Sequence, residues 1–436
     1  MNIQLQTYIK VAAIAMPLFL LSACKVEPIL DPNNPDATGI VVNASLSELQ
    51  NLADGSESGM RESLGAYYDD LCVIGREYYR FSTSDPRFTS DLLGKSSAVL
   101  DNNTFYLTNP FAARYRVIRN TNILIDALTS TKAPITDLQR KAGIAYAKTI
   151  QAYQLLSVFN LLYNNGVRVD VKDPDKLGPF LNLQQSLDAI IGLLNEANTD
   201  LKGNTADLPF TTTLYARNAA QFSKFNRALS ARVAIYKQDW TAANAALTDS
   251  FLDLNGDLTT GVFHLFSAAG GDQLNPLFYP RNSSGETRVA HPSFVTDAEV
   301  GDKRLSKVTL RTSAAFQDAL QSNYDFYLYK TNVDPIPIVR NEELVLILAE
   351  VKAQLGVTAD AVTAINTIRK AAGLTDYAGA TDKNSLITEI LKQRRYSLFG
   401  EGHRWIDLRR YNLLSQLPID RPDDNVWMQF PIPANE

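Results

Sequence analysis

From Ser45 onward the chain repeats apolar residues at intervals of three and four positions, the pattern of amphipathic α-helices. A helix with such a stripe must bury it against another element. The segments with this periodicity are residues 115–128, 135–163, 184–201, 215–236, 241–248, 341–355, 358–372 and 384–398. The pattern therefore predicts a mainly helical, all-α fold.

Short turns join several of these helices into Ala-rich pairs, such as residues 219–236 with 239–247 and residues 342–355 with 361–372. Helix pairs of about 34 residues with small side chains resemble tetratricopeptide repeats, which stack because one pair alone cannot cover its apolar face. We therefore expect residues 41–436 to form one domain, a tetratricopeptide-like scaffold of helix pairs that carries long irregular ligand-binding loops. The loop-rich insertions are residues 76–114 and 251–335.

The beginning of the chain is typical of a lipoprotein signal peptide. Residues 11–21 are apolar but shorter than the roughly 20 residues that span a bilayer, and they lead into Leu21, Ser22, Ala23 and Cys24. Small residues before a cysteine suit lipoprotein processing, whereas a secretory signal with a coincidental cysteine is disfavoured because the chain has only 2 Cys. We predict a signal peptide over 1–23, lipidation of Cys24 and a tether over 24–40.

Composition argues against several classes of protein. With 42 Lys+Arg and 47 Asp+Glu the formal charge is −5, which provides no general attraction to nucleic acid. Two cysteines are too few for a disulfide framework, and we expect Cys72 to be a buried small side chain. His264, His291 and His403 lack the close helical spacing of a zinc protease.

Motif searches find no complete catalytic or metal-binding signature. Residues 55–59 place Glu where a nucleophile elbow needs Ser, and Thr89 stands where a phosphate loop needs Gly. Residues 253–257 begin like a calcium loop, but Leu258 replaces the turn glycine and His264 the final Glu, so calcium is not supported. A cryptic pair of catalytic carboxylates stays an alternative, because glycosidase carboxylates follow no sequence spacing.

Two aromatic clusters in the loop-rich insertions are the candidate ligand-binding site. Exposed aromatic rings stack on the apolar faces of sugars, and Arg, Asp and Asn bind neighbouring hydroxyl groups. The candidate residues are Tyr79, Arg80, Phe81 and Asp85 in the first cluster and Tyr279, Arg281 and Asn282 in the second.

A basic cluster near the C-terminus offers an anion or nucleic-acid patch as one interpretation. Its members are Arg394, Arg395, Arg404, Arg409 and Arg410. Phe399, Glu401, Trp405 and Asp407 are interleaved with them, and Arg404 and Asp407 have the spacing of a helical ion pair. We favour a packed structural motif with internal ion pairs over a ligand site.

Several motifs in this chain, taken in order, resemble the SusD/RagB family of Bacteroidetes outer-membrane lipoproteins. They are the cysteine motif at Cys24, the helix with Arg116, Asn120 and Asn122, residues 145–166, residues 336–350, residues 361–373, the Glu-Gly-His-Arg-Trp-Ile-Asp-Leu-Arg block at 401–409 and Pro-Ile-Pro at 431–433. The resemblance spans nearly the whole chain. One departure is Ser397, where the family usually has an acidic residue.

The resemblance implies a lipid-anchored protein on the cell surface at the outer membrane. Such a protein captures an oligosaccharide and delivers it to a SusC-like TonB-dependent transporter, without catalysis and without a cofactor. Peptide binding, as in the RagB branch, is the main alternative. A lipoprotein glycoside hydrolase and a purely structural tetratricopeptide-like assembly factor are weaker ones.

Overall fold

The computed structural model describes residues 41–434 and residue 436. The predicted signal peptide, Cys24 and the tether lie outside the described residues. Within the part that is described, none of the helices combines the length and the apolar character needed to cross a bilayer.

The described chain is mainly helical, and every helix that the periodicity predicts is present, so the all-α prediction is confirmed. The α-helices are α3 (Leu46–Gly59), α4 (Leu64–Ile74), α5 (Arg87–Ser90), α6 (Phe105–Ser130), α7 (Asp137–Leu162), α8 (Leu183–Leu201), α9 (Ala219–Tyr236), α10 (Trp240–Thr248), α11 (Pro292–Thr296), α12 (Asn341–Gln354), α13 (Thr358–Ala371), α14 (Lys383–Ser397) and α15 (Arg404–Arg410). Short 3-10 helices are η2 (Tyr163–Asn165), η3 (Lys303–Lys307) and η4 (Leu414–Gln416).

Local sequence explains where the long helices begin. Thr136 before α7 and Asn182 before α8 each accept a hydrogen bond from the backbone N–H three residues later. In return, the side-chain oxygens of Gln139 and Gln185 accept from the backbone N–H of the cap residues. These capping boxes satisfy N–H groups that the first helical turn leaves free. They therefore fix the starts of the two helices.

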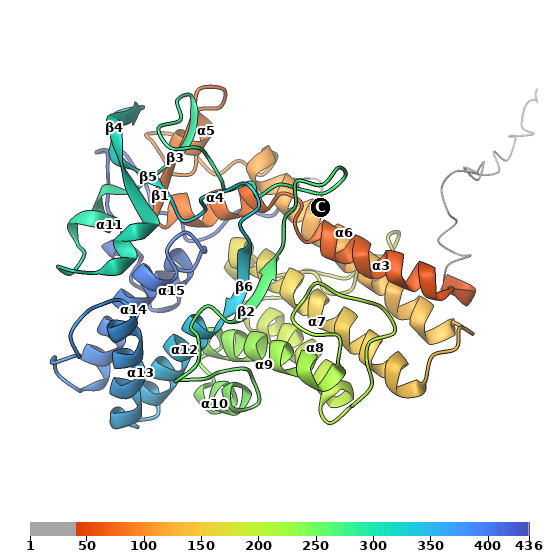
Figure 1. Ribbon diagram of the computed structural model, residues 1–436. Coiled ribbons are helices and arrows are strands. Elements are labelled where there is room, and N and C mark those ends of the chain that lie inside the picture. The colour runs from red at the N-terminus through yellow and green to blue at the C-terminus, as the bar shows by residue number, and fades with distance from the viewer. Residues whose placement is uncertain (1–40, 435) are drawn as a thin grey trace, which may run out of the picture. The chain divides into compact units, whose positions relative to one another are not determined.

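Consecutive helices pack against each other: α6 on α7, α7 on α8, α8 on α9 and α12 on α13 (Figure 1). Helix α7 is buried along most of its length, which agrees with its nearly continuous run of small and apolar residues. A separate apolar cluster joins α12, α13 and α14 through residues such as Leu346, Ile365 and Ile390. This arrangement of paired helices is the predicted tetratricopeptide-like scaffold.

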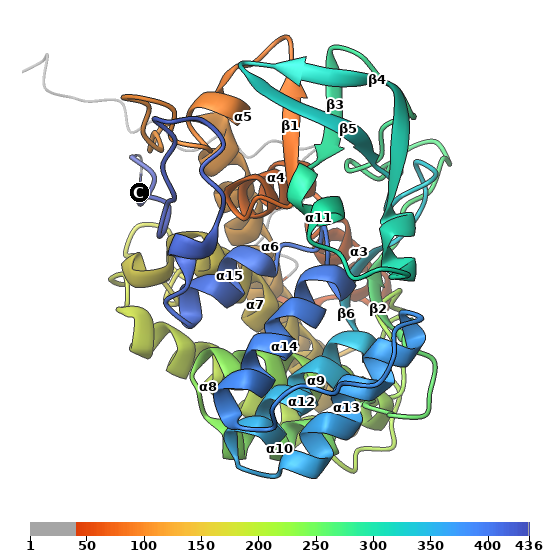
Figure 2. The ribbon, with the colours of Figure 1, turned by 90° about the vertical axis from the view of Figure 1, so that its left-hand side faces the viewer.

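A small antiparallel sheet lies at one end of the helical scaffold, at the top of Figure 2. Its strands, in order across the sheet, are β1 (Tyr78–Ser82), β3 (Glu286–Ala290), β5 (Leu320–Phe326) and β4 (Val308–Gln317). In its register Arg80 pairs with Arg288, and Val289 pairs with Asp325. A second sheet joins β2 (Gly261–His264) to β6 (Ile336–Arg340).

The two predicted loop-rich insertions contain more regular structure than the sequence suggested. Residues 76–114 include β1, α5 and the beginning of α6, and residues 251–335 include β2 to β5. Proline and asparagine favoured a loop before residue 115, yet α6 starts at Phe105 and continues through the buried Pro110. Tertiary burial has therefore overridden the helix-breaking tendency of proline.

Candidate ligand-binding site

Strand β1 carries three of the predicted binding residues, and it is buried. Tyr79, Arg80 and Phe81 expose only 3%, 7% and 4% of their surface. The rings of Tyr79 and Phe81 lie nearly parallel at 5.6 Å on one face, and Tyr79 also contacts the His291 ring at 5.1 Å. The expectation that these residues lie in an exposed loop is wrong, because β1 joins the sheet and is covered on both faces.

Tyr279 belongs to the other predicted cluster and lies over the charged face of the same sheet. Its ring centre is 5.1 Å from the guanidinium carbons of both Arg80 and Arg288. The Arg80 Nη2 group also donates to the Tyr279 hydroxyl at 2.9 Å. Because Arg80 and Arg288 face each other across β1 and β3, they point to one side of the sheet and hold the ring there. The structure thus joins the two predicted clusters through Arg80 and Tyr279.

The loop after Tyr279 is attached to strands β4 and β5. The backbone N–H of Asn282 donates to Asp325 Oδ2 at 2.7 Å, and Asn282 Oδ1 accepts from the Thr312 N–H at 2.8 Å. Arg311 donates to both Asp325 and the Ser283 carbonyl. These bonds fix a loop in which the Arg281 and Asn282 side chains are exposed.

A half-buried aromatic ring that the sequence analysis missed lies next to this loop. The Arg281 guanidinium carbon and the Lys330 Nζ are each 5.7 Å from the centre of the Tyr327 ring. Tyr327 directly follows β5, which ends at Phe326, and it lies within the predicted loop-rich insertion 251–335. We call the group of Tyr279, Arg281, Asn282, Tyr327 and Lys330 the Tyr279 surface.

Asp85, the last predicted binding residue, has its carboxylate occupied. Arg87 donates to Asp85 Oδ1 from Nε at 2.9 Å and to Oδ2 from Nη2 at 2.6 Å. This ion pair and the hydrogen bond from the Arg87 backbone lower the pKa of the Asp85 carboxyl. Asp85 is therefore less free to bind a sugar hydroxyl than Arg281 or the amide nitrogen of Asn282.

A hollow of about 480 Å³ opens between α3 and the segment after β2. Arg61 spans it, donating to Asp272 Oδ1 at 2.6 Å while its guanidinium carbon lies 6.0 Å from the Phe266 ring centre. Glu57, also on its wall, accepts hydrogen bonds from Tyr146 and Thr213 and so is used by the scaffold. The segment that follows β2 lines this hollow and then continues along the chain to Tyr279.

The basic cluster near the C-terminus is largely the packed motif that the sequence predicts. Arg394 Nε donates to Asp407 Oδ2 at 2.6 Å, and Arg410 pairs with Asp407 and with Glu350. The expected pairing of Arg404 with Asp407 is wrong: Arg404 donates to the Arg76 carbonyl at 2.7 Å. The two carboxylate oxygens of Asp407 instead accept hydrogen bonds from Arg394 and Arg410.

The described residues contain no group of three or more His, Cys, Asp or Glu side chains placed to hold a metal ion. The three histidines are buried, and burial lowers the pKa of His264 to about 3 and that of His403 to about 4. Asp253 and Asp257 each accept a backbone N–H two residues later, as in ordinary Asx turns. The predicted burial of Cys72 is confirmed.

Residues 238–431 match the model of the SusD family. The SusD-like protein P38 of Formosa agariphila is 24% identical over 377 residues, covering 68% of this chain and 71% of that protein.

Solved structures share the fold over most of the chain. A SusD superfamily protein from Bacteroides vulgatus is similar with a TM-score of 0.68 at 17% identity, covering 89% of this chain and 96% of the other. Surface glycan-binding protein A from Bacteroides thetaiotaomicron, solved in complex with laminarihexaose, has a TM-score of 0.68 at 14% identity, with coverage of 90% and 97%.

Proposed function

We propose that this SusD-like protein, whose residues 238–431 match the SusD family, binds oligosaccharides at a cell surface. In this proposal it is a binding protein and not an enzyme. It captures the glycan and passes it to a SusC-like TonB-dependent transporter in the outer membrane, where the lipid on Cys24 anchors it. The laminarihexaose complex of a structurally similar protein supports the ligand class.

The observation that carries the proposal is the way Tyr279 is held. A ring that is already fixed against Arg80 and Arg288 loses little conformational freedom when a sugar stacks on it. Arg281 and Asn282 are exposed beside it and can donate to sugar hydroxyls. Tyr327 adds a second half-buried ring within the same surface.

This assignment also divides the seven predicted binding residues by role. Tyr279, Arg281 and Asn282 contact the ligand in the proposal. Arg80 positions the Tyr279 ring, and Tyr79 and Phe81 pack on the opposite face of β1. Asp85 remains a prediction that nothing in the structure strengthens.

Calorimetric titration with a panel of neutral oligosaccharides, laminarihexaose among them, tests the proposal. For the best ligand of the panel, Tyr279→Ala is expected to weaken binding by at least tenfold, the effect of about 1.4 kcal/mol in lost stacking. Tyr377→Ala is the matched control, because Tyr377 is a similarly half-buried tyrosine that lies far along the chain, after α13.

Equal affinity of the Tyr279→Ala variant and the wild type would contradict the assignment of the site. Binding of a peptide panel in place of every glycan would favour the RagB-like alternative. Release of reducing sugar from the panel by the purified protein would favour a glycoside hydrolase.

A further inference from the structure

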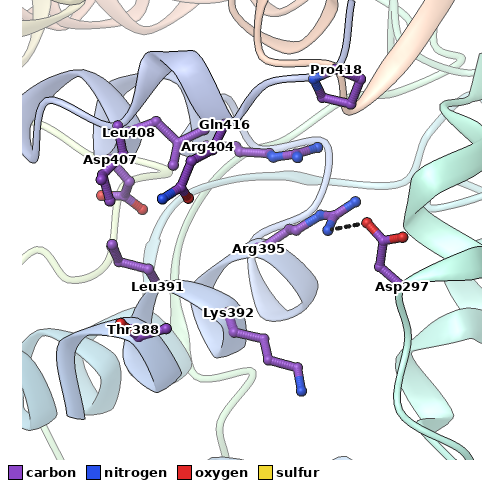
Figure 3. Close-up of a pocket in the computed structure, with 11 residues that line it drawn as sticks. Asp297, Thr388, Leu391, Lys392, Arg395, Arg404, Asp407, Leu408, Gln416 and Pro418 are labelled. Carbon is purple, nitrogen blue, oxygen red and sulfur yellow. Dashed lines mark hydrogen bonds and ion pairs between the residues drawn. The ribbon is translucent and has the colours of Figure 1, made fainter. Parts of the chain in front are cut away.

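A cavity of about 280 Å³ lies between α14, α15, η4 and the end of α11 (Figure 3). Its polar lining includes Arg395 and Lys392 from α14, Arg404 from α15 and Asp297 just after α11. In Figure 3 the side chains of Arg395 and Arg404 extend in the same direction, toward Asp297 and Pro418. The volume is several times the roughly 30 Å³ that one water occupies in the liquid.

The guanidinium of Arg404 lines this cavity, and several of its N–H groups have no acceptor among the described residues. Its only hydrogen bond to the described residues runs from Nη1 to the Arg76 carbonyl oxygen at 2.7 Å. Its Nε and Nη2 groups are not among the atoms sealed from solvent, and the side chain is half-buried. A guanidinium with a free edge of this kind matches the two oxygens of a carboxylate or a sulfate.

Arg395 adds a second guanidinium whose charge is only partly balanced. Its Nη1 donates to Asp297 Oδ2 at 2.9 Å and its Nη2 to Ser293 Oγ at 2.7 Å, while its buried Nε has no partner among the described residues. The side chain of Asp297 is 50% exposed, so water weakens this ion pair.

The other charges at the cavity are already paired. Lys392 Nζ binds Glu299 at 2.8 Å. Both oxygens of Asp407 accept from Arg394 and Arg410. Burial, followed by the charge of Arg395, lowers the pKa of Arg404 to about 9. The protonated guanidinium is therefore held at an electrostatic cost, which a bound anion would reduce.

We propose that this cavity binds one oxyanion of the sulfate or carboxylate class, held by the free edge of Arg404 and by Arg395. The site is separate from the Tyr279 surface and does not depend on glycan binding there. Its ligand is either a small free anion or the acidic substituent of a sugar.

The test is calorimetric titration of the full protein with sodium sulfate and with sodium glucuronate, with sodium chloride at equal ionic strength as the reference. We expect saturable binding of at least one of the two probes, and a loss of at least tenfold in Arg404→Gln. Arg119→Gln is the matched control, since Arg119 is an exposed arginine on α6 with no ion pair to the described residues. It should bind like the wild type.

Two further variants keep the test decisive if Arg404→Gln folds poorly. Arg404→Lys keeps the charge but removes the pair of parallel N–H donors that a guanidinium offers to two oxygens, so the affinity for the anion should still fall severalfold. Asp297→Asn removes a competing carboxylate and should raise the affinity severalfold. Binding of sulfate but not glucuronate identifies a free anion, and binding of glucuronate identifies an acidic sugar. Absence of saturable binding of both probes, or equal binding by Arg404→Gln and Arg119→Gln, would overturn the proposal.

Discussion

At the scale of single residues, several buried charges depend on partners from distant parts of the chain. Asp69 on α4 accepts from Arg288 Nε at 2.7 Å, from Arg288 Nη2 at 2.8 Å and from the Tyr78 hydroxyl at 2.9 Å. All three side chains are buried. The same Arg288 holds the Tyr279 ring, so this ion pair links the stability of the core to the proposed binding surface.

Asp69→Asn is expected to destabilise the fold strongly. The change leaves the Arg288 charge buried without a counter-charge, which costs about 3–5 kcal/mol. The measurement is the free energy of unfolding from urea denaturation at pH 7. Asp126→Asn is the control, because its ion pair with Lys172 is exposed at the surface and contributes at most about 1 kcal/mol. Similar losses in the two variants would count against the argument.

Glu77 provides a prediction about pH. Its side chain is buried beside the turn between α14 and α15. Oε1 accepts one bond from the Gly400 N–H at 3.0 Å, while Oε2 has no hydrogen-bond partner among the described residues. Burial raises the pKa of the carboxyl to about 7 from 4.5. A folded-state pKa above the unfolded one means that protonated Glu77 favours the fold. This stabilisation is complete below pH 4.5 and is lost as the pH rises toward and past 7.

Glu77→Gln should remove this part of the pH dependence. Relative to the wild type, the variant is expected to gain up to roughly 3 kcal/mol in the free energy of unfolding between pH 4.5 and pH 8. Urea denaturation of both proteins across this range measures the difference. Both proteins contain the same buried histidines. Their lowered pKa values make the free energy of unfolding rise with pH, and this contribution cancels in the difference between the two proteins. A constant difference between the two proteins across the range would refute the assignment.

At the scale of elements, the end of α7 shows how a turn positions the next segment. Gly166 follows η2 with a φ of +68°, and a Cβ there would overlap the carbonyl oxygen of Leu181. The turn lets Leu181 N–H bond the Val167 carbonyl at 2.9 Å, which leads the chain into α8. The Asn-Asn-Gly sequence marks this helix end, but the close approach of residue 181 is a tertiary contact.

Gly166→Ala should therefore cost clearly more than the same change at Gly203. Both glycines have a positive φ, but among the described residues no atom outside the neighbouring residues lies within 4 Å of a Cβ placed on Gly203. We expect Gly203→Ala to cost about 1 kcal/mol from backbone strain alone, and Gly166→Ala about 3 kcal/mol or more through the added overlap. Urea denaturation measures both, and equal losses would show that the turn relaxes without cost.

At the scale of the whole molecule, the proposed function requires attachment to the outer membrane through the lipid on Cys24. Cys24→Ser should abolish incorporation of a labelled fatty acid and release the protein from the membrane fraction when the full chain is expressed in a host that processes lipoproteins. Cys72→Ser should keep the label, because Cys72 is buried within α4. Loss of label in both variants, or in neither, would contradict lipidation at Cys24.

The helices and the small sheet differ in how far local sequence predicts them. Each long helix carries its own apolar stripe, and several carry their own caps, so α7, α8 and α12 to α14 could be predicted to within a few residues. Strand β1 has no such local signal: its five residues are all buried because β3 pairs with one edge and other elements cover both faces. Its polar and aromatic sequence alone suggested a loop.

What the sequence by itself determined is the helical scaffold and the resemblance to the SusD family, and it predicts a lipoprotein signal at the start of the chain. These features rest on periodicity, caps and motifs that are local along the chain. Only the tertiary structure decided which predicted binding residues are accessible, that Arg80 supports Tyr279 from 199 positions away, and that Arg404 has no carboxylate partner among the described residues. Those outcomes depend on contacts between segments that are distant in the sequence. Many arginines compete for a few buried carboxylates, and the local sequence does not indicate which arginine pairs with which carboxylate.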